Sequence, residues 1–222
     1  MDLAQISFME WLHAVFRRGE PSDASTWADD LLYRLAAYGD RAYADAGSVA
    51  SLILWYTTIV FRDPLFVLRG FNETERRDGI REISDSFLWQ LLWDGGAPRP
   101  VTIQCVNSMY NLFDRYFRKQ GHDHPSLPYW WTSLLAPLAV SSESWDMREV
   151  EGVAFPVMRR ILRRVDTPQC RISVLSGLNE CVARGSPAAA GIIDEFLQCF
   201  PNVSKEIHDY AALCRNGRVW LP

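Results

Sequence analysis

The chain has 222 residues, of which 48% are hydrophobic and 23% are charged, so it can bury a sizeable core and is not that of a disordered protein. Its formal net charge of -4 gives no overall attraction for a phosphate backbone, so only a local cationic patch could bind nucleic acid. The five cysteines include no Cys-x-x-Cys pair and indicate neither a disulfide framework nor a zinc site.

The N-terminal segment does not have the pattern of a signal peptide. It has no basic region before its apolar positions, and Gln5 and Glu10 interrupt those positions. The longest apolar run, residues 49–61, is too short to cross a bilayer. We therefore expect a soluble, cytoplasmic protein with no membrane contact.

Apolar residues recur at helical spacing along most of the chain, and no sustained alternation predicts a strand, so the expected fold class is all-α. About ten helices are predicted, at residues 3–16, 24–38, 48–61, 73–93, 101–119, 129–140, 150–165, 169–183, 188–200 and 203–215. Glycine and proline residues break the chain between them, and short connections favour antiparallel neighbours. We expect one domain over residues 1–222, with residues 95–100 as the candidate boundary.

Residue types that carry chemistry are few and scattered. His122-Asp123-His124 is the one cluster of metal-ligand types, but no other pair has the spacing to complete a site, so no metal and no cofactor are expected. Asp29 and Asp30 diverge by about 100° on a helix and are interpreted as a solvated face. No phosphate-binding glycine loop or nucleophile elbow is present. We expect no catalytic residues and no small-molecule ligand, although an enzyme with an unrecognised site stays an alternative.

Tyr129, Trp130 and Trp131 begin one predicted helix and cannot all face one core, because three successive helical residues span about 200°. At least one should face outward or against a neighbouring segment. Trp130 and Trp131 are named here as candidate partner contacts, and core packing of two of the three aromatics is the competing interpretation.

The predicted helix 150–165 has two distinct faces. Its apolar residues form one stripe at 3.6-residue periodicity, made of Ala154, Val157, Met158, Ile161, Leu162 and Val165. Arginines occupy the opposite side, at positions 159, 160, 163 and 164. Asp166-Thr167-Pro168 then ends this helix and begins the next, with Thr167 as N-cap and Pro168 as first residue.

The next three predicted helices repeat this amphipathic spacing. Gly177 lies inside the helix 169–183, where glycine costs about 1 kcal/mol relative to alanine, so we expect a neighbouring helix to pass close to it. Gly185-Ser186-Pro187 supplies a helix end, a cap and a helix start. Short amphipathic helices joined by tight turns are typical of a helical solenoid.

The segment Ile161–Asp166 followed by Cys170–Leu178 resembles a HEAT repeat, with Asp166 at the family's turn aspartate and Arg171 at its early helix-B arginine. The similarity is looser over residues 150–213, within a HEAT-like C-terminal part of residues 150–215, and the N-terminal half has more aromatic residues and no clear Asp and Arg pair. The resemblance implies an α-solenoid of stacked antiparallel helix pairs with scaffold or adaptor use. An irregular helical bundle is the alternative for residues 1–140.

These patterns favour a non-enzymatic module, of adaptor, scaffold or immunity and inhibitor type, that binds a protein partner. Guanidinium groups suit bidentate carboxylate recognition, so Arg159, Arg160, Arg163 and Arg164 are expected to bind an acidic partner surface rather than to stabilise the fold. The alternative is nucleic-acid binding or processing through the same residues with Arg148 and Arg171. A third interpretation is that this face is only solvated or paired with nearby Asp and Glu.

Overall fold

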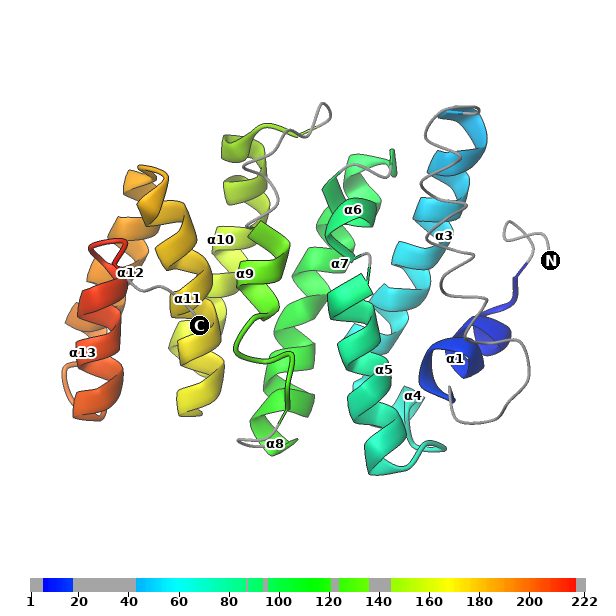
Figure 1. The fold of residues 1–222 in the computed structure, drawn as a ribbon, viewed down its shortest axis with the longest axis horizontal. Coiled ribbons are helices and arrows are strands. Elements are labelled where there is room, and N and C mark those ends of the chain that lie inside the picture. Colours follow the sequence, from blue (N-terminus) through cyan, green and yellow to red (C-terminus); the bar gives the residue numbers. More distant parts are fainter. Residues whose placement is uncertain are drawn as a thin grey trace. The chain divides into compact units, whose positions relative to one another are not determined.

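The computed structural model describes residues 6–17, 43–86, 88–93, 96–120, 124–135 and 145–218 (Figure 1). These residues form helices and connecting turns with no strand among them, which confirms the all-α fold class. The predicted helix 24–38, with Asp29 and Asp30, lies outside the described residues. No helix in the described ranges combines the length and apolar character needed to cross a bilayer.

The chain divides into two compact units, one of residues 1–109 with 142–146 and the other of residues 110–141 with 147–222. The division falls within a continuous helix, between Met109 and Tyr110, and not at residues 95–100. We refer to these as unit 1 and unit 2 and describe each separately.

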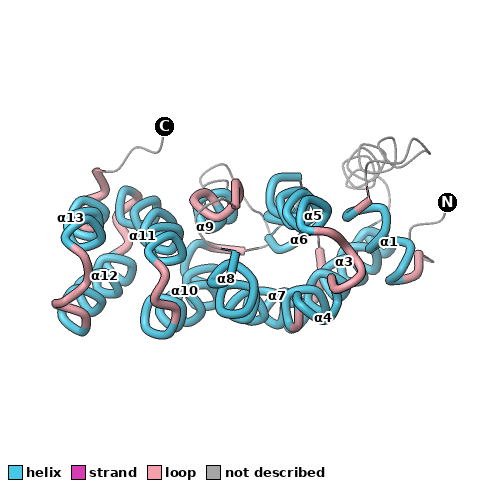
Figure 2. The backbone as a smooth tube through the Cα atoms, turned by 90° about the horizontal axis from the view of Figure 1, so that it is seen from below, coloured by secondary structure: helices cyan, strands magenta, loops and turns pink. Residues whose placement is uncertain are grey.

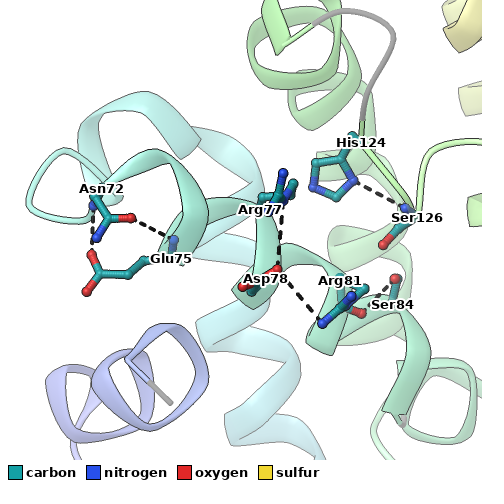
Figure 3. A network of polar contacts seen from close by, with 8 residues as sticks. All are labelled: Asn72, Glu75, Arg77, Asp78, Arg81, Ser84, His124 and Ser126. Atoms are coloured by element: carbon teal, nitrogen blue, oxygen red, sulfur yellow. Dashed lines mark hydrogen bonds and ion pairs between the residues drawn. The ribbon is translucent and has the colours of Figure 1, made fainter. Parts of the chain in front are cut away.

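Unit 1 contains a series of helices, two of which have starts capped by side chains. Ser7 Oγ accepts from the N–H of Glu10, and the Glu10 carboxylate accepts from the N–H of Ser7, which is a capping box. Asn72 and Glu75 exchange the same pair of bonds, at 3.0 and 2.7 Å (Figure 3). The helices are α1 (Phe8–Phe16), α3 (Tyr43–Arg62), α4 (Pro64–Val67), α5 (Glu73–Ser86), α6 (Leu88–Trp93) and α7 (Arg99–Asn111), which continues into unit 2.

Helix α1 packs against α5 at a glycine. A Cβ on Gly79 would lie 2.1 Å from Cδ1 of Phe16, so the ring fills the space that any larger residue would need. Trp11 is fully buried beside Tyr56, whose hydroxyl donates to the carbonyl of Ile6 at 2.8 Å. Aromatic residues thus form much of the core around α1.

Unit 2 is arranged around α11. Its helical segments are the π-helix η2 (Leu112–Phe117), α8 (Arg118–Gln120), α9 (Trp130–Leu135), α10 (Met147–Arg164), α11 (Pro168–Ala183), α12 (Pro187–Cys199) and α13 (Lys205–Cys214). Helix α11 contacts α9, α10, α12 and α13. Figure 2 shows α11 and α13 in one layer and α10 and α12 in the other. Each of α10 to α13 begins and ends within three residues of its predicted bounds.

The turn from α11 to α12 follows the predicted order of end, cap and start. Gly185 has a φ of +86°, and the N–H groups of Gly185 and Ser186 donate to the carbonyls of Val182 and Cys181, which is a Schellman motif. Ser186 Oγ then accepts from the N–H of Ala189. Thr167 is likewise the N-cap of α11, but its hydroxyl makes no capping bond.

Gly177 on α11 is the point where α9 comes closest. A Cβ on Gly177 would lie 2.4 Å from Cβ of Trp131 and 3.1 Å from Cε of Met158. No real Cβ approaches another carbon as closely as 2.4 Å, so the close approach expected from the sequence is confirmed. Arg184 also holds α9, because its Nη1 donates to the carbonyl of Leu135 at 2.8 Å.

Gly177→Ala is expected to lower the free energy of unfolding by about 1–3 kcal/mol, because the added methyl forces α9 and α11 apart. Gly191→Ala on α12 is the matched control. A Cβ on Gly191 would meet no atom within 4 Å, so alanine should stabilise there by about 0.5–1 kcal/mol through helix propensity. Urea denaturation measures both, and equal stabilisation at both positions would contradict the close approach.

Candidate functional site

Helix α10 carries its four arginines on the side opposite its buried stripe. Arg159, Arg160, Arg163 and Arg164 are all exposed, whereas Val157, Met158, Ile161 and Leu162 are buried. We call the four arginines the arginine face. Together with Pro156 they line a shallow, open depression on the surface of unit 2. The expected exposure of these residues is therefore confirmed.

Arg159 and Arg163 are held by an acidic residue of the next helix in the same layer. Glu195 on α12 pairs with both: its Oε2 lies 3.0 Å from Arg159 Nε, and its Oε1 accepts from Arg163 Nη2. About half of each arginine side chain stays exposed, so each pair contributes at most about 1 kcal/mol. For these two residues the structure shows the pairing with a nearby acidic residue that was the third interpretation of this face.

The aliphatic parts of this bridge border a small apolar cleft. Leu162, Ile192, Phe196 and Phe200 line it beneath Arg159, Arg163 and Glu195. Arginine commonly covers apolar surface with its methylene stem while its charged group stays in water. The Arg159–Glu195–Arg163 bridge thus closes the seam between α10 and α12.

Arg160 and Arg164 form a second pair, one turn apart, with a different environment. The guanidinium of Arg160 lies 3.6 Å from the centre of the Tyr110 ring, a cation–π contact. Neither Arg160 nor Arg164 has an acidic partner within the described ranges of the chain. The nearest acid in sequence, Asp166, is paired with Arg118 at 3.1 Å. Arg160 and Arg164 are therefore exposed positive charges.

Arg171, at the position of the HEAT-like resemblance, is on α11 and not on the arginine face. Its guanidinium carbon is 5.5 and 5.2 Å from the ring centres of Phe196 and Phe200, and burial lowers its pKa from the ordinary value. It packs α11 against α12 and is only partly exposed, whereas Arg148, the other residue of the nucleic-acid alternative, is exposed near the start of α10.

The tryptophans expected at a partner surface are buried. Trp130 and Trp131 are each 1% exposed, whereas Tyr129 is 42% exposed and is the outward member of the three. Both indoles pack on the ring of Phe113. A partner could reach neither without separating these helices, so we correct that expectation and assign both to the core.

Of the candidate metal cluster, His122 and Asp123 lie outside the described residues. His124 is buried, and its Nδ1 accepts from the N–H of Ser126 at 3.3 Å (Figure 3). Its ring packs edge-on against Tyr116 and Phe117. In the part of the chain that the structure describes, no three His, Cys, Asp or Glu side chains are grouped to hold a metal ion.

The thiols differ in accessibility. Burial raises the pKa of Cys170 to about 11 and those of Cys105, Cys181 and Cys214 to about 12, so these thiols stay protonated and unreactive at neutral pH. Cys199 is exposed and borders the cleft beneath the Glu195 bridge.

Replacing Arg159 and Arg163 together by Glu is expected to lower the free energy of unfolding by about 1–2 kcal/mol, because two further carboxylates then surround Glu195. Adding Glu195→Arg to this variant reverses the central charge and should restore most of the loss. Urea denaturation at low ionic strength measures both. An equal loss with and without Glu195→Arg would show that the bridge does not contribute.

Neither the scan of protein-family models nor the searches of curated proteins and of solved structures found a match to this chain. No relative therefore assigns a role to any residue of the arginine face.

Proposed function

We propose that this protein is a non-enzymatic interaction module, used as an adaptor, scaffold or inhibitor, that binds an acidic surface of a protein partner through α10. The observation that carries the proposal is the pair Arg160 and Arg164, exposed and without an acidic partner in the described ranges. Arg159 and Arg163 serve to hold α12, so the face presents Arg160 and Arg164 to the partner.

The proposed architecture for this role is a HEAT-like stack in unit 2. Support comes from the two layers formed by α10 to α13 and from their short connections. The residues of the resemblance also have structural partners: Asp166 pairs with Arg118, and Arg171 packs on two phenylalanines. In such a stack these residues fix neighbouring helices and leave the outer face of α10 for binding.

Charge favours a protein partner over nucleic acid. A duplex binder needs several free cations to neutralise phosphates, whereas Glu195 engages two of the four arginines here and offsets one of their charges, and Arg171 is partly buried. The net charge of -4 adds repulsion at longer range. Two free guanidinium groups are enough to recognise an acidic patch on a protein.

Arg160→Glu with Arg164→Glu is expected to weaken binding of the purified partner, identified by copurification from the source cell, by at least about tenfold. The measurement is isothermal titration calorimetry, with circular dichroism to verify the fold. The matched control is Lys119→Glu with Arg218→Glu, which changes two exposed cations of unit 2 and gives the same net charge.

Equal losses in the two double variants would mean that net charge, and not α10, determines binding. Unchanged affinity in the Arg160→Glu, Arg164→Glu variant would show that the arginine face does not contact the partner. Tight binding of duplex DNA, with an affinity that falls steeply with salt and depends on Arg160 and Arg164, would favour the nucleic-acid alternative instead.

A further inference from the structure

Resting on the proposed function, we infer that Arg160 and Arg164 form a carboxylate subsite, which binds one Asp or Glu side chain of the partner in the way that Arg159 and Arg163 bind Glu195. The recognised group is thus a single carboxylate, and its two ligands are guanidinium groups one helical turn apart. Four observations support this subsite: the spacing of the two arginines, the orientation of Arg160, the lack of a paired carboxylate among the described residues, and the open surface beside them.

The spacing of the two arginines matches that of a pair already engaged. Arg159 and Arg163 are four residues apart on α10, and the single carboxylate of Glu195 contacts both. Residues four apart on a helix lie on one side of it, about 6 Å apart along the axis, so two long side chains can converge on one group. Arg160 and Arg164 have this same spacing on the same helix. The folded chain therefore contains an internal example of the proposed contact.

The ring of Tyr110 fixes the orientation of Arg160. A guanidinium group that lies 3.6 Å over an aromatic ring keeps its N–H groups in its own plane, where they can donate to a carboxylate. Fixing the side chain before binding reduces the entropy lost on association. Arg160 is thus prepared for an anion in a way that a freely rotating surface arginine is not.

No carboxylate of the described residues competes for the two arginines. Among the residues that the structure describes, Glu195 is engaged by Arg159 and Arg163, and Asp166 by Arg118. No carboxylate of these ranges is paired with Arg160 or Arg164. An incoming acidic side chain therefore displaces none of the described carboxylates from Arg160 or Arg164.

The surface that leads to the subsite is open. Gly152 and Pro156 precede Arg160 by two turns and one turn in the same row of α10, and both are exposed and uncharged. A Cβ at Gly152 would meet no atom of the described residues within 4 Å, so none of them covers the helix there. Pro156 also borders the depression formed by the arginine face. A segment of the partner can lie along this row and place its acidic residue between Arg160 and Arg164.

The probe for the experiment is fluorescein-labelled hexaglutamate, with hexaglutamine as the uncharged control, and binding is followed by fluorescence anisotropy. Arg160→Gln and Arg164→Gln are each expected to weaken hexaglutamate binding by about fivefold or more, as for loss of a charge-assisted hydrogen bond. Arg159→Gln and Arg163→Gln, which make the same change in charge one residue earlier, should change it by less than about twofold because the N–H groups of both are already engaged by Glu195.

Two further variants test the parts of the subsite. Tyr110→Leu should weaken binding, whereas Tyr110→Phe keeps the ring and should preserve it. Glu195→Gln should strengthen binding, because it opens the equivalent position between Arg159 and Arg163. In the Glu195→Gln variant, adding Arg163→Gln should weaken hexaglutamate binding as much as adding Arg164→Gln does.

Equal losses from all four Arg→Gln variants would overturn the subsite and leave a general acidic-partner surface, so the proposed function would stand. Failure of hexaglutamate to bind, while the α10 charge reversal still abolishes partner binding, would overturn the carboxylate chemistry alone. Tighter binding of duplex DNA than of hexaglutamate, dependent on Arg160 and Arg164, would overturn the subsite and the proposed function together.

Discussion

The close approach of α9 to α11 at Gly177 is the contact on which the rest of unit 2 depends. Because Gly177 has no side chain, the backbone of α9 at Trp131 can lie against α11, and this directs the two indoles of α9 into the core beside Phe113. Helix α11 then has a fixed neighbour on one side and can pack α10, α12 and α13 around its remaining surface. The position of the arginine face follows from this packing, since the buried stripe of α10 determines which side faces solvent.

The arginine face has two parts because of where its neighbours lie. Arg159 and Arg163 face the seam with α12 and meet Glu195, while Arg160 lies on the side of Tyr110. Arginines of one helix thereby serve two purposes: Arg159 and Arg163 pair α10 with α12, and Arg160 and Arg164 stay exposed. In an acidic chain, this internal pairing lowers the positive charge that the arginine face presents, which favours contact with a defined acidic group over long-range attraction to a polyanion.

Periodicity predicted the helices of unit 2 well from α10 onward, because three of these four helices combine their apolar stripe with a proline or glycine at a boundary. It missed α4, since four residues are too few to show a period, and it could not reveal the π-helical turns at Leu112–Phe117. The direction in which the side chains of Trp130 and Trp131 point depends on their contacts with helices distant in sequence. The pairing of Glu195 with Arg163 joins positions 32 residues apart, which no local pattern encodes.

Cys199 gives this chain a natural reporter position. The other four cysteines are buried, and the raised pKa of their thiols protects them from alkylation, so a maleimide dye should attach at Cys199 without any engineered mutation. Its attachment point borders the same cleft as Arg159, Arg163 and Glu195. Rearrangement of the seam between α10 and α12 would then be visible as a change in emission of a dye on the wild-type protein.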